Sequence, residues 1–177
     1  MEYVVSVDGD VDAKEKSSGS KDYRKRPLEV GIENGDSEMV ELLLAGGANA
    51  NKTFESHCNS HKSPLSLAVE KKDLTIVSLL LQYKADVSYS SYYISGPLVS
   101  ALKNGSEDIA TTLIEHGADP NISIPVGKYN EKQTIIRYAV ENEYTAVVEC
   151  LLKHGAKQEM GGKGWNDKHE NDSLLSL

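Results

Sequence analysis

Short apolar segments recur along the chain, and each opens with the pattern Pro-Leu-x-x-small or a degraded form of it. The openings lie at residues 27, 64, 97 and 135, which gives intervals of 37, 33 and 38 residues. An alanine follows 21 residues after every opening, at Ala48, Ala85, Ala118 and Ala156. The length variation therefore falls between an alanine and the next opening, where a loop absorbs it most easily.

Each repeated segment predicts two helices joined by a tight turn. A proline in the first helical turn has no useful N–H to lose, and its φ is already helical. The polar turns at residues 33–35 and 103–105 end in a glycine that can stop the first helix in a left-handed conformation. The second helix carries apolar residues at helical spacing, such as Met39, Leu42 and Leu43. Because one such pair cannot bury its apolar side alone, we expect the pairs to stack.

These segments resemble ankyrin repeats, a family with the opening pattern T-P-L-H-x-A and a period of about 33 residues. The best matches to that pattern are residues 63–68, SPLSLA, and residues 117–121, GADPN. The resemblance covers roughly residues 27–157. It implies an all-α solenoid of stacked helix-turn-helix units with hairpin-like loops and about four full repeats. Tetratricopeptide arrays, the nearest alternative, have a period and an aromatic signature that this chain lacks.

The chain outside the array is polar at both ends. We expect residues 1–26 to form a polar segment in which residues 9–14, GDVDAK, resemble the tail of a partial repeat. Residues 158–177 form a second polar tail, and residues 173–177, SLLSL, mirror SPLSL at 63–67. That similarity indicates the start of a truncated fifth repeat. An irregular tail at each end is the alternative.

Two departures from the family pattern predict an array less stable than a consensus one. The family's histidine is replaced by Glu29, Ser66, Val99 and Arg137, which weakens the expected coupling between repeats. Lys84 stands where a helix-ending glycine belongs, and a left-handed side chain costs on the order of 1 kcal/mol.

Composition excludes several classes of function. A net charge of −8 argues against nucleic acid, whose binding depends on neutralising phosphates. No apolar run approaches the roughly 18 residues that a membrane span needs. With two distant cysteines, Cys58 and Cys150, and no secretory signal, we expect reduced thiols and a cytoplasmic location.

The sequence carries no pattern typical of an enzyme, a metal site or a cofactor site. Residues 161–164, GGKG, lack the spacing and the Ser/Thr of a phosphate-binding loop. His57, Cys58 and His61 crowd together, whereas a zinc site needs four ligands, usually in spaced pairs. We therefore expect a non-catalytic protein without metal or cofactor.

Two sets of residues are candidates for contact with a partner. The loop after Ala85 holds Tyr89, Tyr92 and Tyr93, and tyrosines give a large, rigid contact area with a polar tip. The alternative is that some of these rings pack on the adjacent loop. The second set lies at equivalent positions of the first helices: Glu33, Glu70 and Glu141, with Lys103 as the exception, followed by Asn34, Lys71, Asn104 and Asn142. An acidic and amide stripe would suit a basic peptide, unless it is simply a solvated face. Asn121 is similar to sites of asparagine hydroxylation described for ankyrin proteins.

The resemblance implies a module that binds another protein through its loop tips and its concave helix face. We expect a monomer that binds neither nucleic acid nor membrane. The alternative is a regulatory or targeting arm of a larger protein, such as a kinase, channel, toxin or ubiquitin-ligase adaptor. Contact residues vary while the scaffold is shared, so the sequence does not identify the partner.

Overall fold

The computed structural model describes residues 12, 25–55, 61–90, 96–126 and 131–157. Within these residues eight helices form four pairs, which we call units 1 to 4. The pairs are α1 (Pro27–Asn34) with α2 (Ser37–Ala45), α3 (Pro64–Glu70) with α4 (Leu74–Gln82), α5 (Pro97–Lys103) with α6 (Glu107–Glu115), and α7 (Ile135–Glu141) with α8 (Thr145–Lys153). Every first helix begins at the predicted opening, and the expected stack of helix pairs is confirmed.

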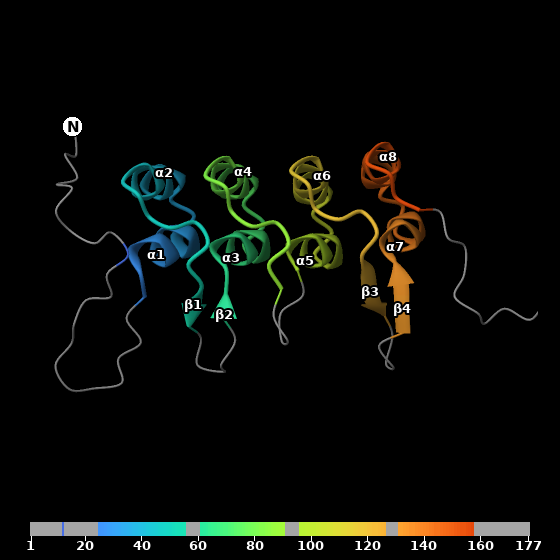
Figure 1. Cartoon of the computed structure of the whole chain (residues 1–177), viewed down its shortest axis with the longest axis horizontal. Coiled ribbons are helices and arrows are strands. Elements are labelled where there is room, and N and C mark those ends of the chain that lie inside the picture. The colour runs from blue at the N-terminus through green and yellow to red at the C-terminus, as the bar shows by residue number, and fades with distance from the viewer. Residues whose placement is uncertain (1–11, 13–24, 56–60, 91–95, 127–130, 158–177) are drawn as a thin grey trace, which may run out of the picture.

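The helices lie in two rows (Figure 1). We call α1, α3, α5 and α7 the inner helices and α2, α4, α6 and α8 the outer helices. Contacts run from α1 through α3 to α5, and from α2 through α4 and α6 to α8. Each unit thus packs on its neighbours, so the apolar core is a continuous strip whose stability depends on the interfaces between units.

Two of the loops between units return on themselves as short antiparallel ladders. Strand β1 (Phe54–Glu55) pairs with β2 (His61–Lys62), and β3 (Ser123–Val126) pairs with β4 (Glu131–Thr134). These hairpins project from the row of inner helices (Figure 1). The sequence predicted hairpin-like loops here without identifying strands. Buried Phe54 and Ile124 anchor the two outgoing strands, and the ladders satisfy backbone groups before each helix opens.

Left-handed residues end the helices in every unit. Glycine takes this conformation at most of these positions, for example Gly35 with φ 68° and Gly117 with φ 93°. Lys84 adopts it as well, with φ 64°, which confirms the strained position expected from the sequence. Lys72 and Glu143, with φ 58° and 61°, occupy the turn in which units 1 and 3 carry a glycine. These two left-handed residues were not predicted from the sequence.

Small residues let the inner helices approach their outer partners. Ala68, Ala101 and Ala139 are fully buried at equivalent positions of α3, α5 and α7. In α1 the equivalent residue is Gly31, and a Cβ there would lie 3.1 Å from Cγ2 of Val40. The fifth residue of each opening is therefore small because the two helices of a unit pack closely at this position.

Candidate functional site

One surface of the array combines the exposed side of the inner helices with the loop bases that precede them, and we call it the inner face. Near its C-terminal end each inner helix presents one charged residue to this face: Glu33, Glu70, Lys103 and Glu141. These residues are equivalent in the repeat, so the stacking of units brings them into a row. Their role as partner contacts stays a prediction.

In three units the charged residue is bonded to the residue eight positions earlier. Lys25 Nζ lies 2.5 Å from Glu33 Oε2, and Lys62 Nζ lies 2.6 Å from Glu70 Oε2. In unit 4 the amide Nε2 of Gln133 donates to Glu141 Oε2 at 2.7 Å. The extended residues before each helix run alongside its first turns, which explains the common spacing. In unit 3 the helix residue is Lys103, and the earlier residue, Ser95, lies outside the described residues.

These bonds change the electrostatics of the inner face. The hydrogen bond from Lys25 to Glu33 raises the pKa of Lys25. The hydrogen bond from Arg137 Nε, at 2.9 Å, and then the bond from Gln133 lower the pKa of Glu141. Surface pairs of this kind contribute little to stability. They do neutralise the carboxylates, so the three glutamates do not form a row of uncompensated negative charge.

The residues of the turn that ends each inner helix differ in net charge between the middle and the end of the array. Residues 33–35 (ENG) carry −1, residues 70–72 (EKK) carry +1, residues 103–105 (KNG) carry +1 and residues 141–143 (ENE) carry −2. Lys72 Nζ donates to the backbone oxygen of Asn104 at 2.8 Å. Lys71 and Lys103 are exposed, and neither has an ion-pair partner within the part of the chain that the structure describes. The two middle units are therefore positive at this place, whereas the end units are neutral or negative once Lys25 and Arg137 are counted.

The structure gives Tyr89 a contact inside the molecule. Its hydroxyl donates to the backbone oxygen of His61 at 2.9 Å, and the residue is partly buried. The ring thus links the loop after α4 to strand β2 of the preceding loop. Tyr92 and Tyr93, the other two candidates, lie outside the described residues.

A set of bonds between successive loops was not recognised from the sequence. Asn51 Nδ2 donates to the Lys84 backbone oxygen at 2.9 Å, and Asn51 Oδ1 accepts the N–H of Asp86 at 2.7 Å. Asn121 Oδ1 accepts the N–H of Lys157 at 2.9 Å. The recurring signal is an Asn or Asp two residues before these asparagines, which accepts their own N–H and forms a tight turn. These asparagines therefore hold neighbouring loops together.

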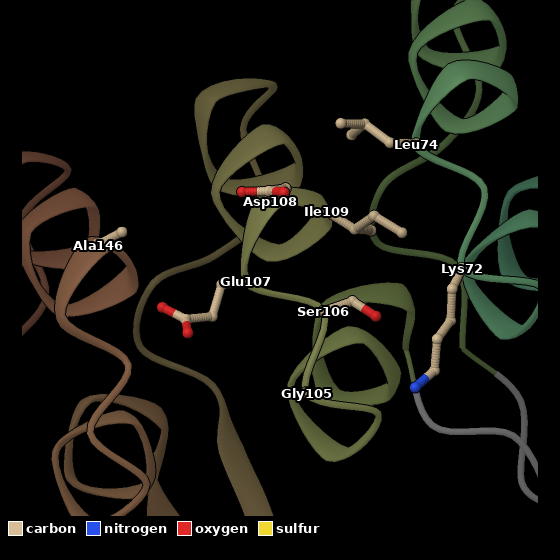
Figure 2. A pocket seen from close by; sticks show the side chains of 8 residues that line it. All are labelled: Lys72, Leu74, Gly105, Ser106, Glu107, Asp108, Ile109 and Ala146. Atoms are coloured by element: carbon tan, nitrogen blue, oxygen red, sulfur yellow. The ribbon is translucent and has the colours of Figure 1, made fainter.

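A shallow depression of about 450 Å³ lies where α6 begins. Figure 2 shows Glu107 and Asp108 from the first turn of α6, with Leu74, Ile109 and Ala146 around them. The two carboxylates complement the positive end of the helix dipole, which accounts for them without a ligand. No side chain in the lining is a thiol or an imidazole that could serve as an activated nucleophile or its base.

Cys150 is the free cysteine among the described residues. Its Sγ lies 3.7 Å from His154 Nδ1, but burial raises the pKa of the thiol and so disfavours the reactive thiolate. The described ranges contain no group of three or more His, Cys, Asp or Glu side chains arranged to hold a metal ion.

Comparison with known proteins identifies one family. The sequence model of that family, described as ankyrin repeats, matches residues 28–124 in three copies. No curated protein matches the chain. The match ends within β3, before unit 4, whose opening lacks the proline. No helix among the described residues is both long and apolar enough to cross a membrane.

Proposed function

Because the chain belongs to the ankyrin repeat family, whose repeats generally act as protein–protein interaction modules, we propose that it binds a partner protein along its inner face and adjoining loop tips. In this proposal the array holds its partner without transforming it. Rigid stacked helices position the side chains, and the binding energy comes from contact with an extended surface rather than a deep pocket.

The observation that carries the proposal is the positive middle of the inner face. Lys71 and Lys103 lie at the C-terminal ends of neighbouring inner helices, and Lys62 neutralises Glu70, the residue before Lys71. The partner in our proposal contributes an acidic segment that crosses units 2 and 3. The protein carries a net charge of −8, so an acidic partner is repelled elsewhere and directed to this patch. A basic peptide would instead have to displace the cations and amides that already bind the glutamates.

Tyrosines of the loop after α4 form the second part of the proposed contact. Tyr92 and Tyr93 keep this role as a prediction, because aromatic side chains frequently dominate the energy of protein interfaces. Tyr89 is less suitable as a test of partner contact. Its hydroxyl already bonds His61, so its substitution would also disturb the loops.

Charge reversal at two matched lysines tests whether the positive patch of the inner face binds the partner. Lys103 ends an inner helix and Lys153 ends an outer one; both lie in the last helical turn and both are exposed. The wild-type chain, Lys103→Glu and Lys153→Glu would be used to capture proteins from a cell lysate, and bound proteins identified by mass spectrometry. We expect the partner to be lost with Lys103→Glu and retained with Lys153→Glu, with equal melting temperatures.

Other outcomes separate the two parts of the contact. If both lysine variants retain the partner, the positive patch is not the contact. If Tyr92→Ala with Tyr93→Ala then loses the partner without a change in melting temperature, the loop tips alone carry the binding. If none of the variants loses it, the proposed inner-face site is wrong.

A second candidate function is a targeting or regulatory arm within a larger protein. The observation in its favour is an uncovered apolar face on unit 4, where Val140 and Leu152 are exposed. A different domain or further repeats encoded beyond residue 177 would favour this function over a free-standing adaptor or inhibitor.

A further inference from the structure

The side of unit 4 that faces away from unit 3 exposes apolar residues that are buried in every other unit. Val140 on α7 is 58% exposed, whereas the equivalent Ile32, Val69 and Leu102 are each 0% exposed. In units 1 to 3 this position is covered by the next unit along the array. We call the corresponding side of unit 4, formed by α7 and α8, the C-terminal face.

The outer helix repeats the same difference. Leu152 on α8 is 43% exposed, whereas the equivalent Leu44, Leu81 and Ile114 are 3%, 6% and 1% exposed. Isolated exposed apolar residues are ordinary on protein surfaces. Here both helices of one pair expose the positions that form the interface inside the array, and such a patch indicates a binding surface.

We infer that the C-terminal face receives a fifth helix pair of the same kind, which continues the array in the same polypeptide and opens at residues 173–177. The face continues an interface already formed by units 1, 2 and 3, and at each of those a helix pair covers it. Residues 173–177, SLLSL, share four of five residues with 63–67, SPLSL. Leu174 lies 39 residues after Ile135, close to the earlier intervals of 37, 33 and 38. Residues 158–177 themselves lie outside the described residues.

A second copy of the chain is the competing occupant of the C-terminal face, because unit 1 is also uncovered on the side that faces away from unit 2. Met39 is 46% exposed, whereas the equivalent Ile76, Ile109 and Val147 are at most 2% exposed. Asp12, however, already lies at the loop of unit 1. Its Oδ2 accepts the N–H of Asn49 at 3.3 Å, at the equivalent place where Asn51 and Asn121 bond the loop of the following unit. A second copy would have to displace Asp12 from this position, which favours the fifth unit.

To test the inference, the proposed fifth unit is completed with residues copied from unit 2. Residues 68–85 are appended after Leu177, so that the residues from 173 onward reproduce unit 2 apart from Leu174. A second version carries Leu174→Pro, which makes the added unit identical to unit 2. Thermal unfolding of the chain and both extended versions is followed by circular dichroism. We expect the extension to raise Tm by roughly 2–4 °C for each kcal/mol that the added interface between units contributes.

Aspartate pairs on the two end faces test where the added unit docks. Val140→Asp with Leu152→Asp alters the C-terminal face, and Val30→Asp with Met39→Asp is the matched control on the exposed side of unit 1. We expect only the first pair to abolish the rise in Tm. The control pair should leave the rise intact. Hydrogen exchange of α8 amides should slow in the extended chain and return to the original rate with the first pair.

Three results would overturn the inference. One is no rise in Tm with either extended version. The second is a rise that survives Val140→Asp with Leu152→Asp. The third is a dimer of the unextended chain, measured by light scattering, that the same pair dissociates, because a second copy would then occupy the face. The inference does not depend on the partner proposed for the inner face.

Discussion

Units 2 and 4 form helices of equal length with very different local support. In unit 2, α3 has Pro64 in its first turn, and the hydroxyl of Ser63 accepts the N–H of Ser66 at 3.1 Å. At the start of α4, Asp73 accepts the N–H of Ile76 at 3.0 Å. Both helices of unit 2 therefore begin at a residue whose side chain satisfies a free backbone N–H.

Unit 4 has neither of these caps. Thr134 precedes α7 without a capping bond, and its buried Oγ1 has no hydrogen-bond partner among the described residues. Tyr144 precedes α8 and provides no side-chain cap either. Nevertheless α7 and α8 have seven and nine residues, the same as α3 and α4. Packing on one neighbouring unit is thus enough to form the pair, and local signals mainly adjust its stability.

The largest expected effect compares one substitution at equivalent positions of the two units. Val69 is fully buried between units 2 and 3, and Val140 is exposed on unit 4. We expect Val69→Ala to lower the free energy of unfolding by about 2 kcal/mol, through lost burial and the cavity left behind. Val140→Ala should change it by less than about 0.5 kcal/mol. Urea unfolding measures both, and equal losses would show that Val140 is buried in solution.

The next largest effect on stability is expected from the helix cap at Asp73 in unit 2. Asp73→Ala removes the acceptor for the N–H of Ile76, and we expect a loss of about 1 kcal/mol. Asp73→Asn is the matched control, because asparagine caps a helix about as well as aspartate. If both variants lose equal stability, the charge of Asp73 matters rather than its capping bond.

Exchanging the helix-ending residues of units 2 and 4 should change the free energy of unfolding in opposite directions. Lys84 and Gly155 occupy equivalent left-handed positions, with φ 64° and 84°. We expect Lys84→Gly to stabilise the protein by up to about 1 kcal/mol and Gly155→Lys to destabilise it by a similar amount, because only glycine adopts this conformation without strain. Melting of the two single variants checks the signs. A loss on Lys84→Gly would mean that the lysine side chain makes a stabilising contact.

The smallest effect concerns the ionisation of Glu141. Its pKa is lowered by hydrogen bonds from Arg137 and Gln133, so Arg137→Met should raise the pKa toward its ordinary value. Because the folded-state pKa lies below the unfolded one, this group stabilises the fold above the unfolded pKa. That contribution is lost as the pH falls through the folded pKa. An NMR titration of the Glu141 side chain measures the shift, and no change would show that the Arg137 bond does not persist in solution.

Much of the fold could be predicted because its signals are local and repeated. Pro64 and Pro97, the alanines 21 residues after each opening and the exceptional Lys84 all lie where the repeat pattern placed them. Less of the site could be predicted. The row of Glu33, Glu70 and Glu141 followed from equivalent positions, but its bonds to Lys25, Lys62 and Gln133 depend on how the preceding strand lies against the helix.

The sequence by itself determined the units, their boundaries and the family, because periodic apolar residues, prolines and glycines act through local conformation and helix packing. Only the tertiary structure decided which side chains of successive units meet. In the folded chain Asn51 bonds the loop of unit 2 and Tyr89 bonds His61, whereas Val140 and Leu152 stay exposed. The reason is that neighbours in a stack are set by the packing of whole units, and a residue's position in its own repeat does not reveal whether another unit covers it.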